Sequence, residues 1–112
     1  MKTPIDYIEF KSTDLEKTKK FYSEAFGWEF TDYGSSYVSF SEAGITGGFE
    51  LSTEPIKNGA LVVLYHGDLK TIKEKVIKSG GVISKEIFGF PGGKRFHFMD
   101  PSGNELAIWS EK

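Results

Sequence analysis

Apolar and polar residues alternate at the start of the chain and then change to helical spacing. Ile5 to Lys11 alternates and is predicted to be a strand, with Ile8 and Phe10 on one side and Tyr7 and Glu9 on the other. Ser12-Thr13-Asp14 is a helix-start signal, with Asp14 or Thr13 as the cap. The following positions recur at helical spacing and form one largely apolar face: Leu15, Thr18, Phe21, Tyr22, Ala25 and Phe26.

Gly27 supplies the stop signal of this helix, and turn-rich segments divide the residues after it into short strands. The strands predicted in the first half are Trp28–Tyr33, Tyr37–Ser41 and Thr46–Leu51. The second half repeats the pattern, with a strand at Ala60–Tyr65 and a helix that opens at Asp68-Leu69. Its later strands are Val82–Ile87, Lys94–Met99 and Glu105–Ser110.

The helix signals of the two halves repeat in register. The same number of residues separates Asp14 from Asp68 as separates Gly27 from Gly81. We therefore predict an α+β fold of two βαβββ modules, about residues 1–53 and 58–112, within a single domain that spans 1–112.

One side of each strand is expected to pack against the helices. The predicted core consists of Ile8, Phe10, Leu15, Phe21, Tyr22, Phe26, Val62, Leu64, Leu69, Ile72, Val76, Leu106 and Ile108. The other side of each sheet is then free to curl into a concave surface.

Composition excludes several classes of function. The absence of cysteine excludes disulfides, thiolate metal sites and cysteine nucleophiles, and it fits a cytoplasmic protein. The net charge is −2 with both signs interspersed, so no basic patch predicts a nucleic-acid partner. No apolar run is long enough to predict a membrane partner.

Two segments carry a family resemblance. Asp14–Tyr22, continued by Ala25–Phe30, resembles the first helix of glyoxalase-like proteins and the strand after it. Asp100-Pro101-Ser102-Gly103-Asn104, followed by the last strand, is similar to that family's turn. The chain therefore resembles the glyoxalase/bleomycin-resistance/dioxygenase (vicinal oxygen chelate) superfamily. This implies paired modules that form a cup-shaped mixed sheet with the site inside the cup, and a homodimer.

The resemblance also implies four positions for a metal, on the first and fourth strands of each module. They fall on Tyr7, near Glu50, on Leu61 and on Ala107. Leucine and alanine cannot ligate a metal, and open catalytic sites need about three protein ligands. We therefore expect no metal and no other cofactor. A weakly held divalent ion is the alternative.

Three residues are candidates for acid–base chemistry. Glu9 and Glu50 would face the cup if their neighbours meet the helix, and the alternative for both is a solvated surface charge. His97 shares a strand face with Arg95, and the two could bind an anionic or carbonyl oxygen at the rim of the cup. The alternative for this pair is the polar side of a half-buried strand. His66 ends a strand and is expected to be a loop residue.

The remaining cup positions are mainly apolar and aromatic. The predicted ligand-binding residues are Tyr7, Leu61, Val63, Tyr65, Arg95, Glu105, Ala107 and Trp109. Trp109 would stack on a flat ligand, or else lie in a dimer interface. Phe88–Gly93 is interpreted as a long hairpin connection that could also act as a flap, and Gly47-Gly48 as a bulge or a close backbone approach.

Two functions fit this wall. The first is binding of a small, flat organic molecule in the cup, without a metal. The alternative is a metal-dependent lyase, isomerase or dioxygenase of the type related to lactoylglutathione lyase. A fold shared by both cannot decide between them.

Overall fold

The computed structural model describes residues 2, 4–57 and 59–112, and it repeats one order of elements twice. The first module contains β1 (Tyr7–Ser12), α1 (Leu15–Phe26), β2 (Glu29–Asp32), β3 (Tyr37–Ser41) and β4 (Thr46–Leu51). The second contains β5 (Val62–Tyr65), α2 (Leu69–Lys78), β6 (Val82–Phe90), β7 (Gly93–Met99) and β8 (Glu105–Ser110). The predicted α+β fold with two βαβββ units is confirmed.

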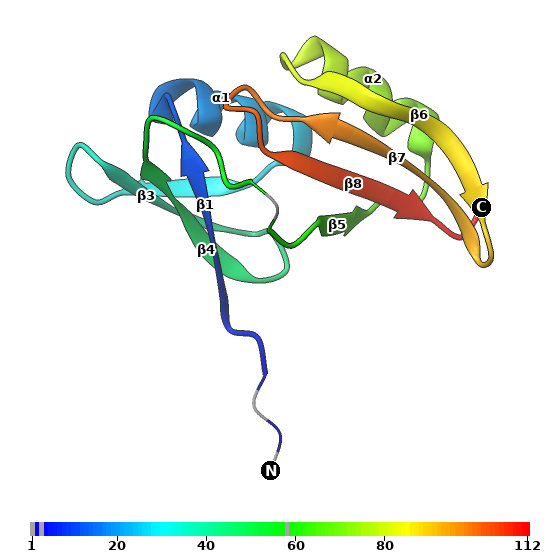
Figure 1. The fold of residues 1–112 in the computed structure, drawn as a ribbon, viewed down its shortest axis with the longest axis horizontal. Coiled ribbons are helices and arrows are strands. Elements are labelled where there is room, and N and C mark those ends of the chain that lie inside the picture. The colour runs from blue at the N-terminus through cyan, green and yellow to red at the C-terminus, as the bar shows by residue number, and fades with distance from the viewer. Residues whose placement is uncertain (1, 3, 58) are drawn as a thin grey trace.

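Each module builds its own mixed sheet, as Figure 1 shows. The strand orders are β1-β4-β3-β2 and β5-β8-β7-β6, with one parallel pair in each sheet, β1 with β4 and β5 with β8. Among the described residues the strands hydrogen-bond into two four-stranded sheets rather than one continuous cup-shaped sheet. The edge strands β1 and β5 lie toward the middle of the molecule (Figure 1).

The helices begin and end at the predicted signals. Asp14 caps α1 by accepting a hydrogen bond from the Lys17 amide at 3.1 Å, and Gly27 ends it in the left-handed conformation. Asp68 caps α2 in the same way. Aspartate satisfies an otherwise unpaired amide at a helix start, and glycine adopts a positive φ without strain.

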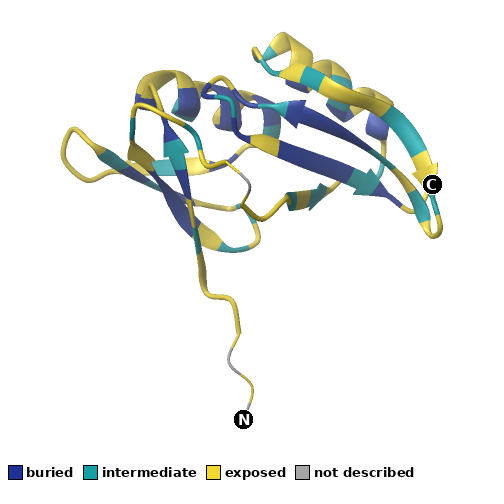
Figure 2. Ribbon diagram, viewed as in Figure 1, coloured by how far each residue is buried: buried dark blue, intermediate teal, exposed yellow. Residues whose placement is uncertain are grey.

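Helix α1 joins the two sheets through aromatic contacts. Phe21 packs against Phe98 of β7, with ring centroids 5.9 Å apart. Its neighbour Tyr22 packs against Phe49 of β4 at 5.1 Å. Both helical side chains are fully buried, and the buried apolar residues of both modules belong to one cluster. Figure 2 shows this burial along α1, β4, β7 and β8.

The core prediction is confirmed for nine positions and corrected for four. The confirmed residues are Phe10, Leu15, Phe21, Tyr22, Leu69, Ile72, Val76, Leu106 and Ile108. The half-buried ones are Ile8, Phe26, Val62 and Leu64, which pack against the cluster from outside. Three of these lie on the edge strands β1 and β5, where a neighbouring strand covers only one side.

Trp28 was expected to open a strand, but it belongs to the core. It precedes β2 and stacks between Tyr22 and Phe40, with ring centroids 4.7 and 4.6 Å away. The flat side chain of Trp28 therefore packs between α1 and β3.

Two interpretations of glycine-rich segments are also decided. The interpretation of Phe88–Gly93 as a long hairpin connection is wrong, because β6 runs to Phe90 and only Pro91-Gly92 form the turn. Gly92 has a φ of 111°, which favours glycine. Gly47-Gly48 is a close approach and not a bulge, since the pairing of β4 is continuous and a Cβ on Gly47 would meet the Ile8 carbonyl.

A buried polar cluster, here called the module clasp, ties the turn before β8 to the first module. Asp100 accepts hydrogen bonds from the Tyr22 hydroxyl at 2.9 Å and from the Asn104 amide group and backbone. Asn104 in turn donates to the Lys11 carbonyl at 2.6 Å and accepts from the Ile56 amide. One turn therefore binds β1, α1 and the connector between the modules.

Ser102 completes the module clasp. Its hydroxyl accepts from the Thr13 amide at 2.9 Å and lies against the buried hydroxyls of Ser12 and Thr18. Burial raises the pKa of the Asp100 carboxyl, against the opposing effect of its hydrogen bonds. Desolvation also raises the pKa of the Tyr22 phenol, so this hydroxyl keeps its proton and donates.

Candidate functional site

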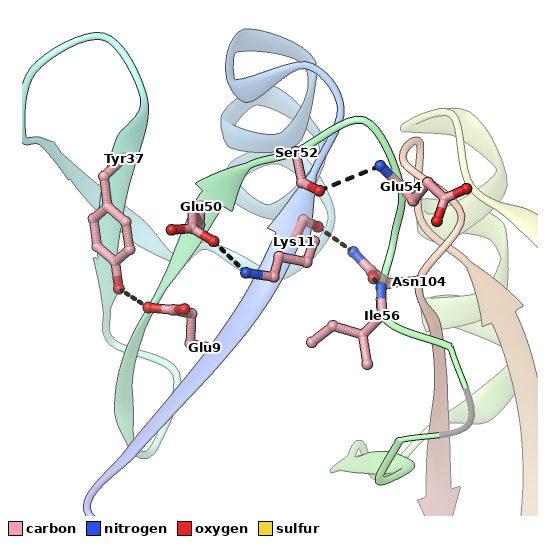
Figure 3. A network of polar contacts seen from close by, with 8 residues as sticks. All are labelled: Glu9, Lys11, Tyr37, Glu50, Ser52, Glu54, Ile56 and Asn104. Carbon is pink, nitrogen blue, oxygen red and sulfur yellow. Dashed lines mark hydrogen bonds and ion pairs between the residues drawn. The ribbon is translucent and has the colours of Figure 1, made fainter.

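The side of the first sheet that faces away from the helices is polar, and we call it the first-sheet face. Glu9 and Lys11 of β1, Tyr37 of β3 and Glu50 of β4 project from it together, as Figure 3 shows. Lys11 forms an ion pair with Glu50, which raises the pKa of the lysine. Phe49, the neighbour of Glu50, points into the core, so strand alternation places these carboxylates as expected.

Two tyrosines and a glutamate form a hydroxyl chain on this face. The Tyr37 hydroxyl lies 2.5 Å from that of Tyr7 and donates to the Glu9 carboxylate at 3.0 Å. Burial and these two partners raise the pKa of Tyr37, so the phenol remains protonated. Gly48 lies beneath the chain. A Cβ there would lie 2.6 Å from the Tyr7 hydroxyl and closer still to that of Tyr37.

The corresponding side of the second sheet is here called the second-sheet face. Strand pairing arranges it in two rows across the sheet. One row is Tyr65, Trp109, Arg95 and Phe88, and the other is Val63, Ala107, His97 and Lys85. The residues between these on the strands, such as Phe96 and Phe98, are fully buried in the core.

The side chain of His97 is hydrogen-bonded to Glu105 of the neighbouring strand β8. Its Nδ1 atom lies 3.2 Å from the Glu105 carboxylate, which also accepts from the Ser84 hydroxyl at 3.1 Å. The ring lies tilted against Phe88, with centroids 5.9 Å apart. The side chain is only 7% exposed, so His97 is a buried residue and not the rim residue that we expected.

Aromatic side chains surround the cation beside this histidine. The Arg95 guanidinium lies over Phe88 at 5.3 Å and over Phe90 at 5.8 Å. Trp109 contacts Phe90 on one side and Tyr65 on the other, with centroids 6.4 and 5.4 Å apart. This band offers flat apolar surface next to positive charge.

Two grooves run along the seam between the modules. One, of about 410 Å³, is lined by β1, the connector and β5, and it includes Glu9, Leu61 and Glu105. The other, of about 570 Å³, lies between the end of α1 and β5, and it includes Trp28, Val63 and Tyr65. The first brings carboxylates of the two sheet faces to one opening.

A family model described as "Glyoxalase/Bleomycin resistance protein/Dioxygenase superfamily" matches residues 4–108. The chain belongs to this superfamily. The resemblance inferred from the two sequence motifs is confirmed, and the match covers both modules.

Relatives of known sequence and structure agree with this assignment. A glyoxylase-like domain-containing protein of Didymella fabae is 31% identical over 93% of this chain and 91% of its own length. The putative glyoxylase CFP32 of Mycobacterium bovis is 26% identical, but the chain spans only 44% of that protein.

Solved structures show the same fold at low identity. A superfamily enzyme from Burkholderia phytofirmans has a TM-score of 0.83 at 14% identity, covering 96% of this chain and 98% of its own. The hypothetical protein SA1046 of S. aureus has a TM-score of 0.76 at 20% identity, covering 98% of this chain and 94% of its own.

The donor groups of this superfamily member do not fit a metal centre. Leu61 and Ala107, at two of the four implied positions, carry no donor atom. Glu50 is bound to Lys11, and Tyr37 donates to Glu9. Within the part of the chain that the structure describes, no three histidine or acidic side chains converge as metal ligands would.

The other predicted site residues are distributed over both faces and the grooves. His97, Glu105 and Arg95 are brought together on the second-sheet face, whereas Ala107 is fully buried and offers no surface to a ligand. Val63 and Tyr65 are exposed on the edge strand β5. His66 serves the turn before α2, where its Nδ1 accepts from the Asp68 amide.

Sequence reasoning missed Tyr37 and Lys11 as members of the first-sheet face. Lys11 follows Tyr7 and Glu9 at the two-residue period of a strand, so alternation along β1 was sufficient to include it. Tyr37 required the register of β3 against β4, which pairs it with Glu50. No local pattern in the sequence specifies that register.

Replacing Gly48 by alanine tests the geometry of the first-sheet face. The new methyl group would displace the ends of the Tyr7 and Tyr37 side chains, so we expect a loss of about 1 kcal/mol in unfolding free energy, as for one broken hydrogen bond. Urea denaturation measures this loss. Gly89→Ala is the control, because its nearest atom would lie 4.0 Å away. Equal stabilities of the two variants would show that the hydroxyl chain does not lie over Gly48.

Proposed function

We propose that the protein binds a small organic molecule with a flat apolar part against the second-sheet face, without a divalent metal. The observation that carries this proposal is the band of Phe88, Phe90, Trp109 and Tyr65 beside the buried polar groups of Arg95 and His97. Flat apolar surface with a few fixed polar groups is the usual composition of small-molecule sites.

The two sheet faces differ in what they leave free for a ligand. On the first-sheet face, Glu9 accepts from Tyr37 and Glu50 pairs with Lys11. On the second-sheet face, Arg95 and His97 each carry a buried nitrogen atom with no hydrogen-bond partner in residues 2, 4–57 and 59–112. This difference supports the second-sheet face as the place where a ligand binds.

The His97–Glu105 pair is the candidate acid–base group of this face. A carboxylate only accepts hydrogen bonds, so Nδ1 of His97 carries the hydrogen that faces Glu105. Nε2 is then the atom that would take or give a proton. Of the three acid–base candidates, His97 has the arrangement best suited to proton transfer.

In the described part of the chain no three histidine or acidic side chains converge, and this supports a function that does not need a metal. The name of the M. bovis relative, a putative glyoxylase, gives the alternative of an enzyme of that type. We propose that the function is binding by aromatic stacking. If the protein is an enzyme, His97 would be the residue that transfers a proton.

Trp109 can report the binding directly. The chain has two tryptophans, so Trp28→Phe leaves Trp109 as the single fluorophore. We expect 2-naphthamide or 2-naphthoate to quench it saturably, to the same extent in EDTA-treated protein and after addition of Ni, Zn, Fe or Mn. Trp28→Phe/Trp109→Phe is the control without the reporter.

Two results would contradict the proposal. One is the failure of both naphthyl compounds to quench Trp109. The other is a stoichiometric divalent ion retained by tag-free protein, on which binding of the compounds depends. The second result would favour the metal-dependent enzyme.

We also propose that the protein is a cytoplasmic homodimer. The edge strands β1 and β5 leave Tyr7, Val63 and Tyr65 exposed, and Leu61 is exposed just before β5. A second copy would cover such side chains. None of the described helices is long and apolar enough to cross a membrane.

Light scattering tests the assembly. At tens of micromolar we expect twice the chain mass of 12.5 kDa. We also expect Tyr65→Lys to shift the protein toward the monomer, since a charge would be placed in the apolar contact. A monomer mass for the unmodified protein over the whole concentration range would refute the dimer.

A further inference from the structure

Two buried nitrogen atoms on β7 lack hydrogen-bond partners among the described residues. They are Nε of Arg95 and Nε2 of His97, two residues apart and on the same side of the strand. Buried polar groups in folded proteins are nearly always paired, and an unpaired one is destabilising. A bound ligand is the simplest partner for two such atoms on one side of a strand.

The two nitrogen atoms differ in their capacity to donate and accept hydrogen bonds. Nε of arginine always carries a hydrogen and can only donate. His97 donates from Nδ1 to Glu105, so its Nε2 accepts when the ring is neutral and donates when the ring is protonated. An oxygen acid of the ligand would satisfy Nε of Arg95 directly and would favour protonation of His97.

The charged groups around the His97 ring are Arg95 on its own strand, Glu105 on β8 and Lys85 on β6. Lys85 and Arg95 both lie over the Phe88 ring, at 5.7 and 5.3 Å. The ring therefore has two cations and a single carboxylate around it. A carboxylate brought by a ligand would add a second anionic partner.

We infer that the ligand of the second-sheet face is a planar aromatic carboxylate. Its carboxylate accepts from Nε of Arg95 and from Nε2 of His97, which takes up a proton from solvent on binding. Its ring lies in the aromatic band beside Trp109. This inference rests on the proposed function and adds the chemical class of the ligand and the two residues that select it.

A ligand can reach the two nitrogen atoms only if the Phe88 ring of β6 moves. Both nitrogen atoms are covered in the unliganded protein, and the Phe88 ring lies against His97 and Arg95. Phe88 sits on an edge strand, next to Gly89 and beyond two interruptions in the pairing of β6 with β7. The Phe88 ring turns outward to solvent to admit the carboxylate, and the ring of the ligand lies beside Trp109.

The test compares 2-naphthoate with 2-naphthamide, which has the same ring without the charge. In the Trp28→Phe protein we expect 2-naphthoate to bind at least about tenfold more tightly, as charge-assisted hydrogen bonds require. Calorimetry at pH 8 in buffers of different ionisation enthalpy should show proton uptake on binding of 2-naphthoate, and His97→Gln should abolish that uptake.

Variants of Arg95 identify the donor. We expect Arg95→Met and Arg95→Lys to weaken 2-naphthoate about tenfold to a hundredfold and to weaken 2-naphthamide much less, because a neutral carbonyl oxygen loses a weaker hydrogen bond than a carboxylate does. Arg95→Lys keeps the charge and lacks Nε, so it remains informative if the methionine variant is poorly folded. Lys94→Met is the matched control, because Lys94 is exposed and points to the other side of the same strand.

The two proposals fail in different ways. Equal binding of the acid and the amide, or unchanged binding of 2-naphthoate in both Arg95 variants, overturns the carboxylate inference and leaves the aromatic site in place. Binding of 2-naphthoate without proton uptake overturns the role of His97. Failure of both compounds to quench Trp109 overturns the proposed function together with the inference.

Discussion

The buried carboxylate of Asp100 is the constraint on which the arrangement of the two modules depends. It receives hydrogen bonds from Tyr22 of α1 and from Asn104, and Asn104 holds the Lys11 carbonyl at the end of β1. A buried acceptor with several donors stabilises only when every donor is in place. The module clasp therefore fixes the turn before β8 relative to the first module, and with it the position of Glu105 and Trp109.

The same sheet architecture gives two faces with different chemistry. On the first-sheet face the two tyrosine hydroxyls, Glu9 and Glu50 have partners within the chain. The second-sheet face carries the aromatic band, and there buried nitrogen atoms of Arg95 and His97 have no hydrogen-bond partner among the residues that the structure describes. A fold shared by a whole superfamily does not specify function, so the unpaired groups of this chain are better evidence than its family.

Local signals in the sequence were sufficient for the order of the helices and strands and for the ends of α1. Asp14 and Gly27 determine the ends of α1 through capping chemistry, and alternation assigns Phe49 and Glu50 to opposite sides of β4. What the sequence could not give is the pairing between strands. The contact of His97 with Glu105 and the row that joins Arg95 to Phe88 depend on registers that only the folded sheet establishes. Ala107 lies on the expected face, but its small side chain is buried between Val63 and His97 of the neighbouring strands.

Chemical denaturation of Asp100→Asn tests the central role of the clasp most directly. The new amide would turn a donor toward either the Tyr22 hydroxyl and the Asn104 side chain or the Ser102 and Asn104 amides. We expect a loss of about 2–3 kcal/mol in unfolding free energy, as for buried donors that lose their acceptor. Asp14→Asn is the matched control, because asparagine caps a helix as well as aspartate does. Equal stabilities of the two variants would contradict the account.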